Sequence, residues 1–194
     1  MRCPVCHRRL APGAACPVNG VPATESGPPP EPLAIPDVPG LSGAALLGVG
    51  GFAHVFAAVR EEDGREVALK VGLGPYHARF AHEAEALRRV GPPTVPAVFQ
   101  QGRVGGRPFL VQELLRGQTL AAWMAALPGT GAASVVRVRE LLTGLCPAVA
   151  RVHAVGLAHR DLKPENLFLR EGGALSLLDF GLARRLEAGA ADAG

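Results

Sequence analysis

The spacing of hydrophobic and polar positions changes from one part of the chain to the next. Residues 66–73 (EVALKVGL) form a mostly apolar run of strand-forming residues, and the turn residues EEDGR before them (61–65) predict a hairpin. Residues 79–90 (RFAHEAEALRRV) carry apolar residues at helical spacing, namely Phe80, Ala84, Leu87 and Val90. The segment 91–93 (GPP) follows as a helix stop. The pattern therefore predicts a strand hairpin followed by an amphipathic helix.

Strand and helix patterns continue toward the C-terminus. Residues 107–115 (RPFLVQELL) predict another strand, and residues 119–127 and 134–156 predict helices. Two short strands are expected within residues 165–180, around the glycine pair 172–173. Because strands dominate the first part and helices the second, the sequence predicts an α+β protein of two lobes.

The longer predicted helix contains residues that disfavour a helix. Gly144 and Pro147 interrupt it, and a proline inside a helix removes one backbone hydrogen bond at a cost of roughly 3 kcal/mol. A kink is therefore expected at this point. Cys146 stands apart from the other cysteines and is expected to be buried.

Composition places the chain among ordinary globular proteins. It has 194 residues, of which 48% are hydrophobic and 19% charged, enough for one domain and a small extra piece. The net charge of +3 is mild and forms no basic block, so a nucleic-acid partner is not expected. No run of about eighteen apolar residues and no apolar leader occurs, which predicts a cytoplasmic protein without a membrane segment.

Composition also divides the chain into segments. Residues 1–20 are rich in cysteine, and residues 21–40 are so rich in proline that they predict an extended linker. From residue 41 to residue 194 the pattern is that of a folded domain. In the cytoplasm, which is reducing, cysteines crowded at one end favour metal binding over a disulfide.

The N-terminal cysteines form a short internal repeat. CPVC (3–6) and CPVN (16–19) resemble the paired knuckles of a zinc ribbon, in which each knuckle offers two thiolates to the metal. The second knuckle has Asn19 in place of the last cysteine, so only Cys3, Cys6 and Cys16 remain as thiolate ligands. The fourth ligand would be His7, a water or nothing. Zinc binding and a metal-free relic with free thiols both stay open.

A glycine-rich turn and a lysine suggest a phosphate site. Gly48, Gly50 and Gly51 lie between two strand-like stretches, where the lack of side chains would let backbone N–H groups approach phosphate oxygens. Such a turn can equally be a plain hairpin, and no P-loop follows it. Lys70 lies on the next apolar strand, where it could reach phosphates or extend to water as an edge residue. Of the carboxylates that could hold it, Glu83 lies beside the apolar helix face and Glu85 away from it.

AHRDLKPENLFL (158–169) is the most specific stretch of the sequence. Together with GVGGFAHV (48–55), VALK (67–70) and DFG (179–181), it resembles the eukaryotic-type Ser/Thr protein kinases that bacteria carry. The resemblance implies a two-lobed kinase fold, with an antiparallel β N-lobe at 41–115 and an incomplete, mainly α C-lobe at 116–194.

The resemblance also implies a role for each matching residue. Asp161 would accept the proton of the substrate hydroxyl, and Lys163 would stabilise the transferring phosphoryl group. Asn166 and Asp179 would hold two Mg²⁺ ions, and Lys70, paired with Glu83, would bind the phosphates of ATP. The implied reaction is transfer of the ATP γ-phosphate to a serine or threonine of a protein substrate.

The rest of the implied ATP site comes from the glycine loop and the hinge. Gln112 would be the gatekeeper, close to the adenine amine or merely satisfying a neighbouring backbone group. The backbone of Glu113 and Leu115 would bind adenine. The remaining contacts implied by the resemblance are loop residues Gly48, Val49, Gly50, Gly51, Phe52 and Ala53, and the ring-sandwiching side chains Val55, Ala68 and Phe168.

The residues after Gly181 raise a second expectation. They contain no serine, threonine or tyrosine, and the later C-lobe helices of the kinase family do not follow. A truncated record of a longer kinase is therefore expected, with a non-catalytic ATP-binding or interaction module as the alternative. The missing helices would expose one helix face, implying a partner chain, poor solubility or a longer protein. The residues of this face are Leu141, Leu142, Leu145 and Val149.

Overall fold

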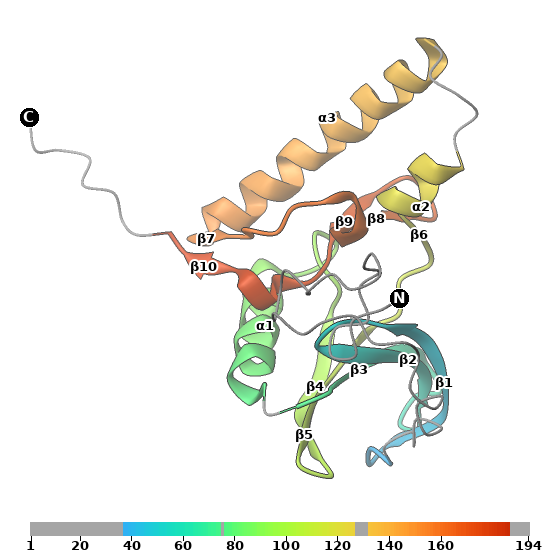
Figure 1. Cartoon of the computed structure of the whole chain (residues 1–194), viewed down its shortest axis with the longest axis vertical. Coiled ribbons are helices and arrows are strands. Elements are labelled where there is room, and N and C mark those ends of the chain that lie inside the picture. The colour runs from blue at the N-terminus through green and yellow to red at the C-terminus, as the bar shows by residue number, and fades with distance from the viewer. Residues whose placement is uncertain (1–36, 75, 127–131, 187–194) are drawn as a thin grey trace, which may run out of the picture. The chain divides into compact units, whose positions relative to one another are not determined.

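The computed structural model of the chain describes residues 37–74, 76–126 and 132–186 (Figure 1). These residues form two compact units, each of which is described by itself. The first unit contains the described residues up to His77 together with Gly102–Val111. The second contains Ala78–Gln101 and the described residues from Gln112 onward. The N-terminal cysteines and nearly all of the predicted linker lie outside the described residues.

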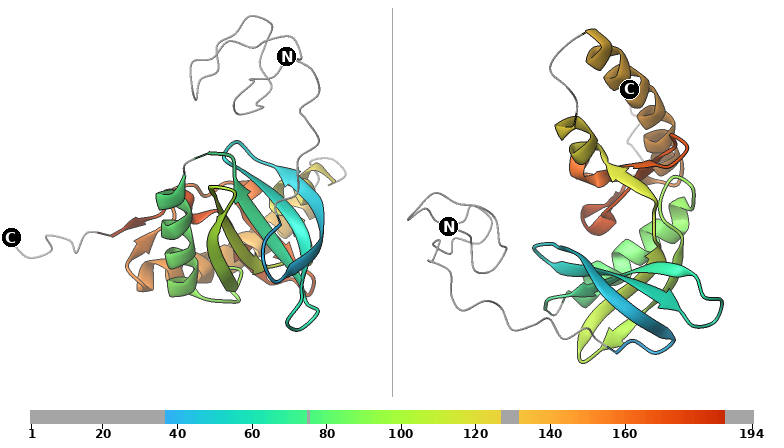
Figure 2. Two further views of the ribbon diagram at one scale, coloured as in Figure 1. Left: turned by 90° about the horizontal axis from the view of Figure 1, so that it is seen from below. Right: turned by 90° about the vertical axis from the view of Figure 1, so that its right-hand side faces the viewer.

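Five strands form one antiparallel-type sheet with the order β1-β2-β3-β5-β4, and Figure 2 shows β1, β2 and β3 side by side. The hairpin of β2 and β3 confirms the predicted turn at 61–65, where Arg60 pairs with Asp63. β4 was not predicted, because its sequence VFQQGRV mixes polar and apolar residues without a regular period. The strands are β1 (Leu41–Val49), β2 (Ala53–Arg60), β3 (Glu66–Gly72), β4 (Val98–Val104) and β5 (Arg107–Glu113).

Alternation along β2 and β3 decides which face of the sheet is buried. Phe56 and Leu69 are register partners, and each is 1% exposed. Val67 and Val71 lie on the same face as Leu69 because successive strand residues point to opposite sides. This face forms the core of the first unit, and the opposite face carries the residues of the candidate site.

Helix α1 (His77–Val90) confirms the predicted amphipathic helix and begins two residues before the predicted start. Its terminal residue is followed by Gly91, whose φ of +77° ends the helix in the left-handed conformation. All of the predicted apolar residues are buried, and Glu83 is buried among them. The buried residues of α1 are Phe80, Glu83, Ala84, Ala86, Leu87 and Val90.

Helices α2 (Leu120–Ala125) and α3 (Ala132–Ala154) confirm the predicted helices at 119–127 and 134–156, with each end shifted by one or two residues. The expectation that Gly144 and Pro147 interrupt the second helix is wrong, because α3 runs through both as one helix. Cys146 is exposed rather than buried, since Ala148 and Val152, one turn apart, define the buried face and Cys146 lies off it.

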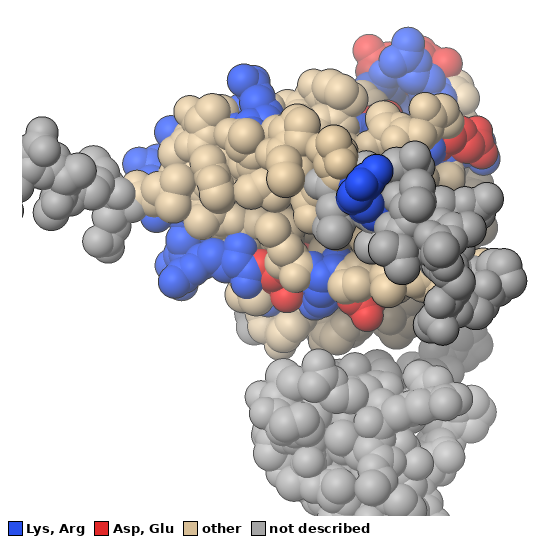
Figure 3. Space-filling view, turned by 90° about the horizontal axis from the view of Figure 1, so that it is seen from above, with Lys and Arg blue, Asp and Glu red and all other residues tan. Residues whose placement is uncertain are grey.

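The face of α3 that was predicted to be exposed is part-buried at the positions whose side chains the structure describes. Leu141, Leu145 and Val149 are each intermediate in exposure, and the Leu142 side chain lies outside the described residues. The predicted partner chain over this face stays a prediction. Within the described residues, no helix is long and apolar enough to cross a membrane. On the face drawn in Figure 3, neutral residues cover most of the coloured surface, and charged side chains lie mainly around its edge.

Short strands complete the second unit. The predicted strand pair around the glycines 172–173 is confirmed, and both glycines have positive φ, as the turn requires. A separate two-stranded ladder pairs Arg184 with Ala158 and Arg185 with Leu157. The strands are β6 (Gly117–Thr119), β7 (Leu157–Ala158), β8 (Leu167–Arg170), β9 (Leu175–Leu177) and β10 (Arg184–Arg185). The α+β fold class is therefore confirmed.

Candidate active site

The glycine loop is a tight connection between β1 and β2. The Gly50 N–H donates to the Ala53 carbonyl oxygen at 2.8 Å, and a Cβ on Gly50 would lie 3.1 Å from that oxygen. A Cβ on Gly48 would have no heavy atom within 4 Å. Phe52, at the end of the loop, is 38% exposed and makes an edge contact with Tyr76. Close backbone approach thus favours glycine at position 50 and leaves space at position 48.

Lys70, Val55 and Ala68 lie on one face of the sheet. Val55 and Lys70 are register partners on β2 and β3, and Ala68 is two residues before Lys70 on the same strand. Lys70 and Val55 are part-buried, in contrast to Phe56 on the opposite face. The sheet therefore brings together, within the first unit, an ammonium group and small or β-branched apolar residues.

The choice between the two glutamates of α1 follows from their burial. Glu83 is 2% exposed, whereas the Glu85 side chain is 67% exposed and pairs with Arg185 at 3.6 Å. The prediction that Glu83, and not Glu85, points inward is confirmed. Lys70 belongs to the first unit and Glu83 to the second, so their pairing stays a prediction.

Asp161, Lys163 and Asn166 form one hydrogen-bonded cluster. Lys163 Nζ donates to Asp161 Oδ2 at 2.8 Å, and Asn166 Nδ2 donates to the same oxygen at 3.0 Å. Asn166 Nδ2 also donates to the Asp161 backbone oxygen at 2.8 Å. These bonds orient the carboxylate of Asp161 by its Oδ2, and Asp161 Oδ1 accepts no hydrogen bond from the described residues. Oδ1 is therefore the oxygen left to accept a proton.

His159 holds the catalytic loop against the strand that leads to Asp179, a role that was not predicted. The ring is 4% exposed, and its Nε2 lies 2.8 Å from the Leu178 carbonyl oxygen, to which it donates. Its Nδ1 then accepts from the Asp161 N–H at 3.3 Å, and the ring meets Phe180 edge-on. Burial lowers the pKa of His159, and the bond to Leu178 opposes this shift. The geometry requires a neutral ring that orients the Asp161 backbone.

Asp179 adopts the left-handed conformation, with φ of 56°, and accepts from the Gly181 N–H at 3.4 Å. The next residue, Phe180, is fully buried and anchors this turn. The sequence motif predicted Asp179 as a site residue, but it did not predict the left-handed backbone conformation of Asp179. Arg79 of α1 also lies close, with its Nη2 3.8 Å from Asp179 Oδ1.

The residues predicted to hold Mg²⁺ suit that ion. Asn166 uses its amide nitrogen to bond Asp161, which leaves its carbonyl oxygen Oδ1 available as a donor atom. Asp179 supplies a carboxylate that is about one third exposed. Mg²⁺ prefers such oxygen ligands, few in number, with substrate phosphates and water completing the shell. Among the described residues, no group of three or more His, Cys, Asp or Glu side chains suited to a metal occurs.

The hinge residues differ in which of their hydrogen-bonding groups already have a partner among the described residues. Gln112 Oε1 is buried and accepts no hydrogen bond, so it does not satisfy a neighbouring backbone group. The Glu113 N–H donates to the Ala97 oxygen at 2.8 Å, which leaves the Glu113 carbonyl as the group that adenine could use. The Leu115 N–H donates to no backbone oxygen of the described residues. Phe168 is part-buried on β8.

The structure contains a polar network behind the hinge that was not predicted from the sequence. The Glu113 carboxylate pairs with Arg170 at 2.6 Å, and Arg170 Nε donates to Ser176 Oγ at 2.6 Å. Ser176, which is fully buried, donates to the Pro93 carbonyl at 2.7 Å. The bond from Arg170 lowers the pKa of Glu113, although burial opposes it. The network joins the hinge to β8, β9 and the segment after α1.

Comparison with known proteins identifies the family of the chain. Residues 42–193 match the family model of the protein kinase domain, and the chain therefore belongs to the protein kinase family.

Named relatives are bacterial Ser/Thr protein kinases. The chain is 38% identical over 151 residues to serine/threonine-protein kinase PknL of Mycobacterium tuberculosis, covering 74% of this chain and 37% of PknL. It is 36% identical over 152 residues to serine/threonine-protein kinase Pkn1 of Myxococcus xanthus, covering 73% of this chain and 21% of Pkn1. It is 33% identical over 150 residues to probable serine/threonine-protein kinase PknB of Corynebacterium glutamicum, covering 72% of this chain and 23% of that protein. The chain thus spans well under half the length of these relatives.

Proposed function

We propose that this chain is the nucleotide-binding and catalytic part of a Ser/Thr protein kinase that transfers the γ-phosphate of ATP to a protein hydroxyl. The observation that carries the proposal is the cluster of Asp161, Lys163 and Asn166, which supplies a base, a cation and a metal ligand within hydrogen-bonding distance of one another. Lys163 beside Asp161 also favours serine or threonine over tyrosine, because this spacing resembles the Ser/Thr-directed class.

The cluster assigns a task to each of its atoms. Asp161 Oδ1 accepts the proton of the attacking hydroxyl, while Oδ2 is held by Lys163 and Asn166. Lys163 would offset the negative charge of the transferring phosphoryl group. Asn166 Oδ1 and the Asp179 carboxylate would hold Mg²⁺, and the ion would neutralise phosphate charge and keep the phosphates in position.

The hinge supplies hydrogen-bonding groups that match adenine. Gln112 Oε1 and the Glu113 carbonyl are acceptors for the adenine amine, and the Leu115 N–H is a donor for a ring nitrogen. A buried acceptor without a partner is costly in the free protein, so occupation by the amine would stabilise the complex. The apolar contacts predicted for Val55, Ala68 and Phe168 and the phosphate contacts of the glycine loop and Lys70 rest on family membership.

Nucleotide binding and transfer are tested in sequence. Thermal unfolding is measured with and without Mg²⁺ and ATP, for the wild type and for Lys70→Ala, and a rise in Tm is expected for the wild type only. Transfer of radiolabelled phosphate to casein as a general acceptor is then compared with Asp161→Asn. Binding without transfer would favour the non-catalytic module, and an unchanged Tm in the wild type would refute the ATP site.

We also propose that Cys3, Cys6 and Cys16 bind zinc. The support is the spacing of the two knuckles in the sequence, since these residues lie outside the described part of the chain. The alternative is a segment with free thiols. Elemental analysis of purified protein should find about one zinc per chain, lost in Cys3→Ser with Cys6→Ser, whereas reactive thiols without metal would support the alternative.

A further inference from the structure

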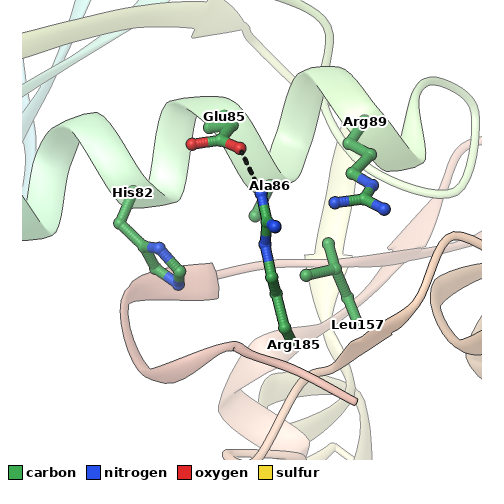
Figure 4. Close-up of a pocket in the computed structure, with 6 residues that line it drawn as sticks. All are labelled: His82, Glu85, Ala86, Arg89, Leu157 and Arg185. Atoms are coloured by element: carbon green, nitrogen blue, oxygen red, sulfur yellow. Dashed lines mark ion pairs between the residues drawn. The ribbon is translucent and has the colours of Figure 1, made fainter. Parts of the chain in front are cut away.

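One stripe of α1 contacts the segment that begins at Asp179. Arg79, His82 and Glu85 are three residues apart and share one helix face. His82 Nε2 lies 2.6 Å from the Ala183 carbonyl oxygen, and Glu85 pairs with Arg185. Figure 4 shows His82 and Glu85 on α1 above the segment that carries Arg185, around a shallow cavity.

Arg79 occupies the end of this stripe nearest to Asp179. Its Nη2 lies 3.8 Å from Asp179 Oδ1, and its side chain is 22% exposed. The distance describes an ion pair rather than a short hydrogen bond. The guanidinium therefore offsets the charge of a carboxylate that belongs to the metal site, and it does so from a helix that contributes no metal ligand itself.

Gly181 explains why the guanidinium fits at this position. A Cβ on Gly181 would lie 2.5 Å from Arg79 Nε and 2.8 Å from Nη2, which is closer than such atoms can approach. Arg79 thus lies against the backbone of Gly181 and uses the space that a side chain would fill. The backbone of Gly181 does not require positive φ, so alanine there would displace the guanidinium without straining the backbone.

We propose that Arg79 holds the Asp179 carboxylate in the metal-free protein and is displaced from it when Mg²⁺ binds. This inference rests on the proposed kinase function, because it takes Asp179 as the metal ligand. Two cations that share one carboxylate repel each other, so Arg79 competes with the metal. Metal binding then weakens the contact of α1 with the Asp179 turn. Arg79 and Asp179 also take part in other interactions, and the proposal requires only that the ion pair between them opposes binding of the metal.

The experiment measures how much Mg²⁺ is needed for nucleotide binding, not enzymatic activity. A fluorescent ATP analogue is held at one concentration with wild type, Arg79→Gln or Gly181→Ala, and Mg²⁺ is titrated. Both variants should reach half-saturation at about two- to fivefold lower Mg²⁺, since part-exposed ion pairs change equilibria by up to about that factor. Arg79→Lys keeps the charge and should remain close to the wild type.

Arg88→Gln is the matched control. Arg88 lies on the same helix but donates to Gln101 at 2.8 Å, so its loss should leave the Mg²⁺ half-saturation unchanged. Circular dichroism verifies that every variant is folded. An equal or higher Mg²⁺ requirement in Arg79→Gln would overturn the inference. Failure of the wild type to bind nucleotide at any Mg²⁺ concentration would instead overturn the proposed function, and the two failures are thus distinct.

Discussion

The glycine loop and the catalytic loop are shaped by different parts of the chain. In the glycine loop the shape depends on the backbone, through the bond from the Gly50 N–H to the Ala53 oxygen. In the catalytic loop it depends on side chains, because Lys163 and Asn166 both hold Asp161. A backbone turn tolerates exchange of side chains wherever there is space. A cluster of side chains, in contrast, is disrupted when one hydrogen-bonding atom is removed.

The strongest test of this contrast removes the charge of Asp161. Asp161→Asn should lower the rate of phosphoryl transfer by about 10²- to 10⁴-fold, because it removes the proton acceptor while the bond from Asn166 to the backbone oxygen remains. Radiolabelled transfer measures the rate, and thermal unfolding should give a Tm close to that of the wild type. Leu162→Ala, an exposed neighbour, is the control. Full activity of Asp161→Asn would exclude this residue as the base.

The buried support of the cluster is tested at His159. His159→Ala removes the bonds to Leu178 and Asp161 and the contact with Phe180, and should lower the free energy of unfolding by about 2–4 kcal/mol. Urea unfolding measures the loss, and His153→Ala, at an exposed position of α3, should change stability by less than about 0.5 kcal/mol. Equal effects of the two substitutions would contradict the supporting role.

The same histidine predicts a pH dependence. Its pKa is lowered in the folded protein from 6.5, so the unfolded chain binds the proton first. The contribution of the neutral ring is complete above pH 6.5 and is lost as the pH falls through that value toward the folded pKa. Unfolding measured between pH 8 and pH 5 should show this loss in the wild type and a weaker one in His159→Gln. Parallel curves for the two proteins would refute the assignment.

Sequence reasoning succeeded where the information is local. The alternation of β3 and the helical spacing of α1 predicted both elements, and the same helical spacing correctly placed Glu83 inside and Glu85 outside. A motif of neighbouring residues also brought together Asp161, Lys163 and Asn166 within one loop. Each of these predictions depends on residues only a few positions apart, and short-range periodicity is what a sequence displays.

The failures concern long-range contacts and burial. Arg170 and Glu113 are 57 positions apart, and no local pattern indicates that they pair. Cys146 was expected to be buried because cysteine usually is, yet the buried face of α3 is set by what packs on Ala148 and Val152. α3 continues through Pro147 because neighbouring helical residues outweigh one missing hydrogen bond. Packing overrode residue preference at Cys146, and the rest of the helix overrode it at Pro147.

A smaller effect on stability is expected in the hinge network, which lies outside the sequence motifs. Glu113→Gln should destabilise the protein by roughly 1–3 kcal/mol at pH 7, because Arg170 loses a charged partner. The pKa of Glu113 is lowered by that bond, so its contribution is present above pH 4.5 and disappears as the pH falls through the folded pKa. Urea unfolding at pH 7 and pH 4 measures both effects. Glu171→Gln, at the exposed neighbouring position, should have little effect, and an equal loss in both would contradict the prediction.

The smallest expected effect returns to the glycine loop and compares two of its glycines. Gly50→Ala places a Cβ 3.1 Å from the Ala53 oxygen and should destabilise the first unit by about 1 kcal/mol, since the turn must open slightly. Gly48→Ala meets no atom within 4 Å and should change the free energy of unfolding by less than about 0.5 kcal/mol. Urea unfolding without nucleotide separates the two. If Gly48→Ala were the more damaging, the loop would not be shaped by the single backbone bond at Gly50, and the contrast with the side-chain cluster around Asp161 would fail.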